Sequence, residues 1–280
     1  MRNETDRSSI PAGRSKPKNG TRGQRNIWAW VILLAGMVYF FLPLIATFEF
    51  SLKMIKDRYT FEAYRVALSD PKFFLNFGYS IMWALLTIFF STLLVVPTAY
   101  WVHWKLPRVR PFVESVTMAP FVVPAVTLTF GLITLYGSPP IVLIGSPVLL
   151  IAGYIILSFP YMFRAVDTGL RAIDVRTLTE AALSLGAGWG VILTQVIFPN
   201  LRTAILSGVF LTFAIVMGEF TLASLMSWPA FGPYMEEVGS MRAYTPQALA
   251  VVSFLLTWAF MGMFYFVGRG RGQEQVAGAH

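Results

Sequence analysis

The sequence predicts an all-α integral membrane protein built as a bundle of six helical spans. Of its 280 residues, 56% are hydrophobic and only 13% are charged. A soluble domain is usually about 25% charged, so lipid is expected to solvate much of this chain. Six runs of about 20 mostly apolar residues follow one another, and each is long enough to cross a bilayer as a helix.

Composition and motifs exclude several classes of chemistry. Cysteine is absent, which excludes disulfide bonds, a thiolate nucleophile and a cysteine metal site. The sequence contains no H-E-x-x-H, no paired carboxylate motif, no G-x-S-x-G and no G-x-x-x-x-G-K-[ST] loop, and His103 has no partner at metal-ligand or triad spacing. We therefore expect no catalytic site, no metal site and no cofactor bound by this chain.

The chain is predicted to contain one membrane domain between two tails. Residues 1–26 are polar and rich in Arg, Lys, Ser, Gly and Pro, which is typical of disorder. The membrane domain is expected over residues 27–268, and a second tail over 269–280. The apolar run that starts at Ile27 is longer than the core of a signal peptide, so it is interpreted as an uncleaved span.

The six spans are expected at 27–48, 74–102, 112–136, 148–166, 204–226 and 248–267. Prolines within or near these spans are predicted to kink the helix or to mark its boundary. They are Pro43, Pro97, Pro120, Pro124 and Pro160.

Basic residues predict the orientation of the spans. With the N-terminus in the cytoplasm, 16 of the 22 Lys and Arg residues lie on the cytoplasmic side and 6 on the outer side. Cytoplasmic loops carry an excess of Lys and Arg, so both termini are expected inside. This rule also accounts for the net charge of +8, and no nucleic-acid partner is expected.

The segment between the fourth and fifth spans, at about 170–203, is the longest cytoplasmic loop in this topology. Its first half predicts an amphipathic helix with one apolar face. Three glycines then break the helix and allow a tight turn, and Pro199 is expected to end a short apolar segment. The apolar face consists of Val175, Leu178, Ala182 and Leu185. Periodicity alone would be satisfied by a generic helix on the membrane surface.

The spacing within this loop carries a more specific signal. Glu180-Ala181-Ala182 is followed by Gly186 and then by Val196-Ile197-Phe198-Pro199. This pattern resembles the EAA loop of bacterial ABC importer permeases, with Val and Phe replacing the family's usual Ile and Leu at two apolar positions. The resemblance extends from about Phe74 to Val267. It implies the fold of a type I ABC importer permease.

The resemblance also implies partners and residue roles. The chain would sit in a bacterial plasma (inner) membrane and form the solute pathway with a second, homologous permease subunit. Two ATP-binding subunits, which carry ATP and magnesium, would dock on the EAA loop, and an extracytoplasmic solute-binding protein would deliver solute. The coupling residues would be Glu180, Ala181, Ala182, Ser184, Leu185, Gly186 and Pro199. The charges of Asp174, Arg171 and Arg176 are read as solvated or as docking contacts.

Two sequence segments and one ionisable residue give weaker indications of the solute. The segments "LRAIDVRTLTEAALSLGA" and "MAPFVVPAVTLTFGLI" resemble the spermidine/putrescine-type permeases and their relatives for 2-aminoethylphosphonate, iron and other small solutes. Glu219 is an ionisable residue deep in the fifth predicted span, which is a functional hypothesis by default. A small polar or charged solute such as a polyamine is therefore expected, and the alternative for Glu219 is a structural role in which it pairs with a neighbouring helix or a backbone group.

Polar and aromatic residues near the ends of the spans are further candidates. Asn76, Tyr79 and Ser80 begin the second span and would face either the solute pathway or the interface. Tryptophans near span ends are interpreted as an aromatic belt: Trp28, Trp30, Trp101, Trp104 and Trp228.

Two other classes of protein remain as alternatives. An ion-coupled secondary transporter would need coupling carboxylates in its spans and an inverted repeat, and the sequence displays only Glu219 and no repeat. A membrane-embedded enzyme would need a catalytic constellation that the sequence lacks.

Overall fold

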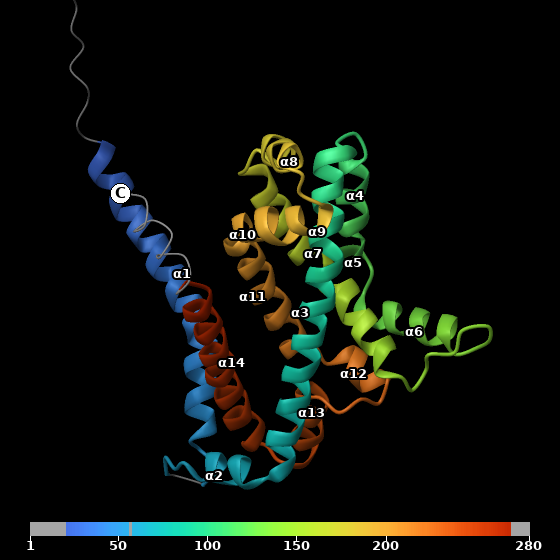
Figure 1. Cartoon of the computed structure of the whole chain (residues 1–280). Coiled ribbons are helices and arrows are strands. Elements are labelled where there is room, and N and C mark those ends of the chain that lie inside the picture. Colours follow the sequence, from blue (N-terminus) through green and yellow to red (C-terminus); the bar gives the residue numbers. More distant parts are fainter. Residues whose placement is uncertain (1–20, 56–57, 270–280) are drawn as a thin grey trace, which may run out of the picture. The chain divides into compact units, whose positions relative to one another are not determined.

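The computed structural model describes residues 21–55 and 58–269, with side chains described for 28–55 and 58–266. The backbone of these residues is mainly helical, as the apolar runs predict (Figure 1). Most of the two expected tails, namely residues 1–20 of the tail at 1–26 and residues 270–280 of the tail at 269–280, lies outside the described residues. Contacts divide the chain into two units, residues 1–47 and 48–280, which are described separately.

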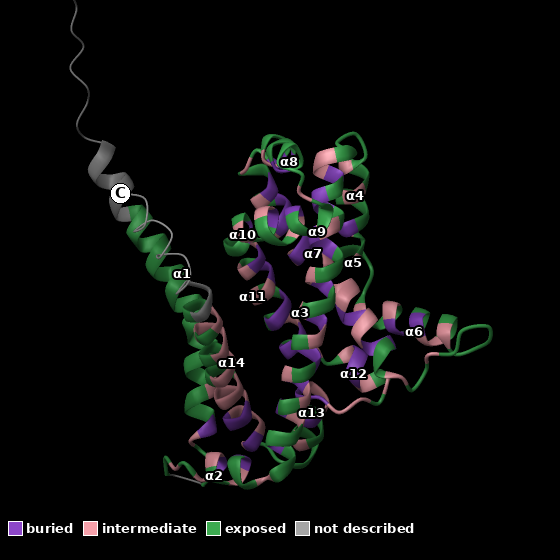
Figure 2. Ribbon diagram, viewed as in Figure 1, coloured by how far each residue is buried: buried purple, intermediate pink, exposed green. Residues whose placement is uncertain are grey.

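The first unit consists, in its described part, of most of helix α1 (Thr21–Ser51). The helix begins at Thr21 and not at Ile27, so it includes residues that the sequence assigned to a disordered tail. Arg and Gln favour helix nearly as well as Leu, which allows an apolar helix to continue into a polar flank. Apolar side chains from Trp28 to Ile45 are exposed along this helix (Figure 2), as expected of a surface that lipid covers.

The second unit contains three further helices that are long and apolar enough to cross a membrane, so the described residues contain four in all. They are α3 (Pro71–Lys105), α7 (Pro147–Arg171) and α14 (Thr245–Arg269). Pro97 lies inside α3 and Pro160 inside α7. These helices confirm the second, fourth and sixth predicted spans. The long helices α3 and α7 pack together with α11 (Arg202–Gly218).

The third predicted span is not one straight helix. It is divided into α4 (Arg110–Thr117), α5 (Ala119–Val122) and α6 (Ala125–Tyr136), and the chain bends by 102° before α6. Val123 is extended, with ψ 116°, because the ring of Pro124 disfavours helical geometry at the preceding residue. The expectation of a boundary at Pro124 is therefore confirmed.

The fifth predicted span is also interrupted. Helix α11 ends at Gly218, and the short helix α12 (Thr221–Leu225) follows after a two-residue break. At its other end, α11 meets the preceding helical segment at 78°. Counting each bent pair as one span gives six, which is the number that the sequence predicts.

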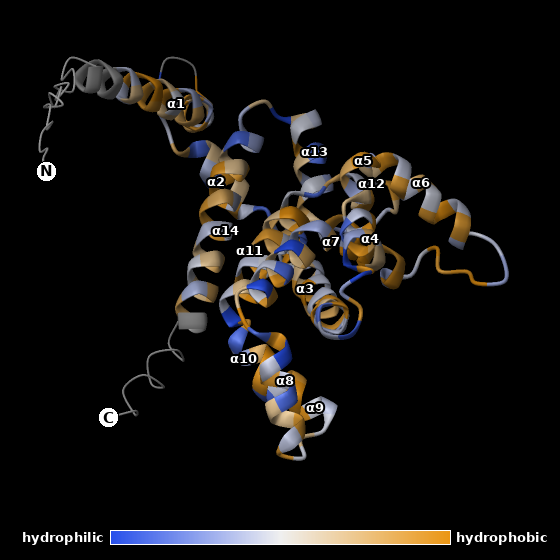
Figure 3. Cartoon of the chain, turned by 90° about the horizontal axis from the view of Figure 1, so that it is seen from above, coloured by the Kyte–Doolittle hydropathy of each residue, from blue (hydrophilic) through white to orange (hydrophobic). Residues whose placement is uncertain are grey.

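Two buried clusters hold the second unit together (Figure 2). One lies toward α2 (Glu62–Ser69) and α13 (Phe231–Met241) and includes Phe73, Phe213 and Leu222. The other lies toward α8 (Val175–Ser184) and includes Tyr100, Phe163 and Ile197. We call these two ends of the unit the α13 end and the α8 end. Hydrophilic residues gather at the α8 end on α8 and α10 (Phe198–Asn200), as the view along the bundle shows (Figure 3).

Candidate functional site

The first turn of α8 is fixed by a side-chain cap. The carboxylate of Asp174 accepts a hydrogen bond from the Thr177 backbone N–H at 3.1 Å and another from the Thr177 hydroxyl at 2.7 Å. These bonds lower the pKa of Asp174, the hydroxyl being the larger cause. One turn later, Arg176 donates to Glu180 at 2.8 Å across an i, i+4 pair. Asp174 and Arg176 therefore have roles within the loop itself.

The last turn of α8 closes through Gly186. The Ala187 N–H bonds to the Ala182 carbonyl at 3.0 Å, and the Gly186 N–H bonds to the Leu183 carbonyl at 2.9 Å. This pair of bonds is the Schellman motif, which requires a left-handed residue just beyond the helix. Gly186 has φ +78°, so the sequence prediction of a glycine-dependent turn is confirmed.

The predicted coupling residues divide between two faces of α8. Glu180, Ala181, Ser184 and Gly186 are exposed, and the Leu185 side chain is 88% exposed. Leu185 was expected on the apolar face. Helix α8 ends at Ser184, however, and Leu185 is the C-cap residue, so the helical period no longer determines where its side chain points. Ala182, by contrast, is buried against this chain's own core, so its small side chain serves internal packing.

The segment after the turn remains helical up to Asn200. It comprises α9 (Trp189–Val191), a π-helical stretch (Ile192–Ile197) and α10. Pro199 was expected to end this segment, but it lies in the first turn of α10, where a missing N–H is tolerated. The break comes at Leu201, which is fully buried.

Two of the tryptophans that the sequence assigned to a membrane belt, Trp101 and Trp104, form a contact between α3 and the loop. The ring centroid of Trp189 lies 5.3 Å from that of Trp101 and 4.8 Å from that of Trp104. Lys105 adds its ammonium at 3.7 Å from the Trp104 ring.

A buried carboxylate joins three helices at the same end. Asp167 of α7 accepts hydrogen bonds from Arg110 of α4 at both oxygens, each at 3.0 Å. His103 of α3 lies 2.8 Å from the same carboxylate, and Arg171 donates to it at 2.9 Å. Glu114 is 3.7 Å from Arg171. The cluster thus links the α3–α4 connection to the helix that leads into α8.

Glu219 has a structural role in this chain. Its carboxylate accepts hydrogen bonds from the N–H groups of Thr221 at 2.7 Å and Leu222 at 3.0 Å, the first two residues of α12. The sequence could not show that the fifth span breaks at this residue, so the carboxylate looked like a lone charge inside a helix.

Of the other predicted pathway residues, one bonds α3 to α13, and the other two have partners within α3 itself. The Ser80 hydroxyl is buried and accepts a bond from the Phe231 N–H at 2.8 Å. Tyr79 stacks on Trp83, with ring centroids 6.3 Å apart. Asn76 donates to the Lys72 carbonyl at 2.8 Å. The structure brings none of these three to the groove described next.

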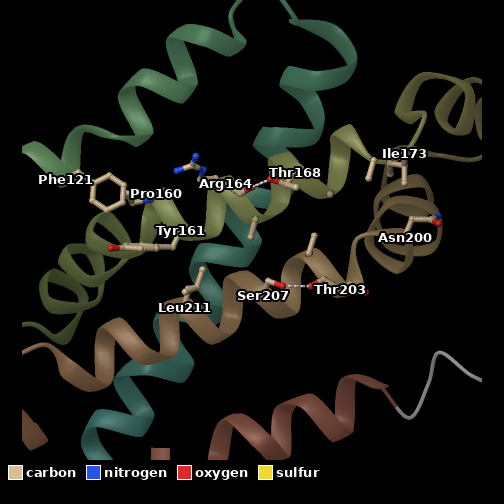
Figure 4. A pocket seen from close by; sticks show the side chains of 14 residues that line it. Phe121, Pro160, Tyr161, Arg164, Thr168, Ile173, Asn200, Thr203, Ser207 and Leu211 are labelled. Carbon is tan, nitrogen blue, oxygen red and sulfur yellow. Dashed lines mark hydrogen bonds between the residues drawn. The ribbon is translucent and has the colours of Figure 1, made fainter. Parts of the chain in front are cut away.

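A groove of about 630 Å³ lies between α7 and α11 (Figure 4). Tyr161, Arg164 and Thr168 line it from α7, and Thr203 and Ser207 line it from α11. The hydroxyls of Thr168 and Ser207 donate to carbonyls of their own helices. The Arg164 guanidinium has no ion-pair partner among the described side chains. Sequence reasoning used Arg164 only for orientation, although a basic residue inside the fourth predicted span, two positions before its end, was a usable signal.

Sequence comparisons identify the family of this chain. The family model described as "Binding-protein-dependent transport system inner membrane component" matches residues 95–269, more than half of the chain. A probable sulfate transport system permease protein of Prototheca wickerhamii is 26% identical over 208 residues, covering 69% of this chain and 79% of that protein. A probable molybdenum ABC transporter permease protein of Haloferax volcanii is 28% identical over 206 residues, covering 70% and 73%. These names do not mention a polyamine.

Solved structures support the fold. A bacterial ABC transporter involved in the import of the acidic polysaccharide alginate aligns with a TM-score of 0.66 at 12% identity, covering 89% of this chain and 98% of that one. An amino acid ABC transporter crystallised with histidines aligns with a TM-score of 0.53 at 18% identity, covering 71% and 94%. The chain belongs to the family of binding-protein-dependent transport system inner membrane components, the multi-pass permease components of ABC importers.

Proposed function

We propose that this chain is the permease subunit of an ATP-driven importer for a small oxyanion. An ATP-binding subunit would dock on α8, whose end of the bundle faces the cytoplasm. The observation that carries this proposal is the exposed face of α8, which presents Glu180, Ala181, Ser184 and Leu185 immediately before the Schellman turn at Gly186. An exposed leucine beside small residues suits a shallow apolar groove on a partner.

The proposed mechanism leaves ATP and magnesium on the partner subunits. Two ATP-binding subunits would close on ATP and move α8, and this chain with a second permease subunit would then switch its access by rigid-body motion. An extracytoplasmic binding protein would supply the solute. The contribution of this chain is positional, because α8 is held by caps at both of its ends.

Two observations favour an oxyanion over the cationic solute that the sequence suggested. The names of the relatives mention sulfate, a tetrahedral dianion, and molybdenum, which forms a similar dianion in water. Arg164 lines the groove between α7 and α11 and has no ion-pair partner among the described side chains, and guanidinium groups bind tetrahedral oxyanions well. Glu219, which motivated a polyamine, is engaged by backbone N–H groups instead.

Docking is tested by site-specific cross-linking. The chain lacks cysteine, so Ser184→Cys introduces a single thiol on the exposed face of α8. We expect this thiol to cross-link to the ATP-binding subunit in membranes. A matched control is Ser240→Cys, an exposed serine on α13 at the opposite end, which should not cross-link. Labelling of Ser184→Cys from outside intact cells, without any cross-link, would overturn both the orientation and the docking role.

The solute class is tested at Arg164. We expect Arg164→Gln to slow sulfate or molybdate uptake by about tenfold or more, because one charge-assisted contact is lost, whereas Arg164→Lys retains part of the rate. Arg242→Gln, at the exposed C-terminal end of α13, is the control and should transport normally. Uptake of a polyamine, or equal oxyanion uptake by Arg164→Gln and wild type, would refute the oxyanion proposal.

A further inference from the structure

Helix α8 is fastened to α3 as well as to its neighbours along the chain. Sequence connects α8 to α7 on one side and, through the turn, to α11 on the other. Its buried residues nevertheless pack in the same cluster as Val96, Ala99 and Tyr100 of α3. A helix tied only at its two ends could roll about its own axis, and contacts with a third helix remove that freedom.

The first fastening is a buried hydrogen bond. The hydroxyls of Tyr100 and Thr179 lie 3.0 Å apart, and both residues are 0% exposed. Thr179 donates its own hydroxyl proton to the Val175 carbonyl at 2.6 Å. Tyr100 is therefore the donor in the interhelical bond, and no water can replace Thr179 as its acceptor without opening the core.

The second fastening is the aromatic contact beyond the turn. Trp189 packs on Trp101 and Trp104 of α3, so the segments before and after Gly186 are both attached to α3. Tyr100 itself is stacked parallel to Trp104, with centroids 6.4 Å apart. Two attachments on opposite sides of one turn hold the loop in a single orientation relative to α3.

The other end of α3 is fastened to α13. Lys72 donates to Glu237 at 2.9 Å, and the Tyr234 hydroxyl donates to Asp70, the cap of α3, at 3.0 Å. Ser80 accepts the buried bond from the Phe231 N–H. One helix of 35 residues, about 52 Å long, therefore contacts α8 at one end of the bundle and α13 at the other.

We propose that α3 is the rod that carries the movement of α8 to α13, with Tyr100 and Trp189 as the positioning residues of the connection. This inference rests on the proposed docking of an ATP-binding subunit on α8. When that subunit moves α8, the fastened end of α3 follows, and because α3 is one continuous helix, α13 at its far end moves with it. The relation is reciprocal, so a partner that binds at α13 biases the position of α8.

The proposed role of α3 is tested by measuring how much solute is taken up per ATP hydrolysed. In the complex reconstituted with its ATP-binding subunits, we expect Tyr100→Phe and Thr179→Val each to lower solute uptake per ATP hydrolysed by about fivefold, with little further loss in the double variant. Thr98→Val is the matched control, because Thr98 is an exposed threonine of α3 that makes the same hydrogen bond to its own helix. If the variants leave the ratio of solute uptake to ATP hydrolysis unchanged, for example because both rates fall in parallel, the proposed role of α3 is refuted.

A probe at the far end gives an independent readout. A spin label on Met241→Cys, an exposed site at the end of α13, should change its spectrum when ATP and magnesium are added. We expect Trp189→Ala to abolish this change and Trp258→Ala, an exposed tryptophan of α14, to preserve it. A spectral response that survives Trp189→Ala overturns the proposal. If Ser184→Cys, in an otherwise wild-type chain, forms no cross-link to the ATP-binding subunit, the result refutes the docking role on which this inference rests.

Discussion

The carboxylate of Asp167 holds the guanidinium of Arg110 through both oxygens, with nitrogen–oxygen distances of 3.0 Å in each case. The two residues are 57 positions apart in the sequence, and Asp167 is only 4% exposed. The pair joins α4 to α7 directly before the loop that contains α8. Planar two-point contacts of this kind restrict orientation as well as distance.

Removing this carboxylate should destabilise the α8 end. We expect Asp167→Asn to lower the free energy of unfolding by about 3 kcal/mol, at the lower end for a broken buried pair because Arg171 remains half exposed and hydrated. Thermal unfolding of the purified protein in detergent measures the change. Glu114→Gln removes a carboxylate that is about half exposed and 3.7 Å from Arg171, so it should have a small effect. Equal melting temperatures for the two variants would contradict the role of Asp167.

The turn after α8 should require glycine at Gly186 but not at Gly188. Gly186→Val places a β-branched residue at φ +78°, which should cost about 1–2 kcal/mol and reduce transport while the protein still inserts. Gly188→Val is the control, since Gly188 has φ −76° and open space around an added Cβ. Uptake assays at matched expression compare them, and normal transport by Gly186→Val would show that the turn adapts without glycine.

Glu219 should matter for folding and not for the charge of the solute. Glu219→Ala removes the acceptor for two N–H groups at the start of α12, and losing such a cap costs about 1 kcal/mol. Glu219→Gln retains one acceptor oxygen and should be milder. Unfolding midpoints should rank the stability of the three proteins, with wild type highest, Glu219→Gln next and Glu219→Ala lowest. A Glu219→Gln variant that folds normally but loses uptake of a cation would restore the pathway role that the sequence suggested.

The cap at Asp174 should make the start of α8 sensitive to acid. Hydrogen bonds from Thr177 lower the pKa of Asp174 in the folded chain. The stabilisation is therefore fully present above the unfolded pKa, about 3.9, and is lost as the pH falls through the lower folded value. Hydrogen exchange of amides in the first turn of α8 should be slower in wild type than in Asp174→Asn at neutral pH. The difference should disappear in strong acid, and a difference that persists there would exclude the carboxylate charge as its cause.

The sequence by itself determined the features that depend on local composition and spacing. Long apolar runs predicted spans at 74–102 and 148–166, which lie within the helices Pro71–Lys105 and Pro147–Arg171, because hydropathy over about 20 residues is sufficient to identify a span. The positive φ of Gly186 was likewise predictable, since a glycine directly after an amphipathic helix is the usual end of such a helix. The coupling role of the EAA-loop residues rests on a resemblance in spacing and stays a prediction.

Only the tertiary structure decided which side chains are partners. Tyr100 and Thr179 are 79 positions apart, and His103 and Asp167 are 64 apart, so no local period brings either pair together. Trp101 and Trp104 looked like belt residues, because a span end predicts an interface but cannot reveal that Trp189 packs there. Glu219 looked like a buried charge because hydropathy does not show where a span breaks. The physical reason is common to all four cases: the energy of a polar or aromatic group is set by the neighbour that the fold supplies.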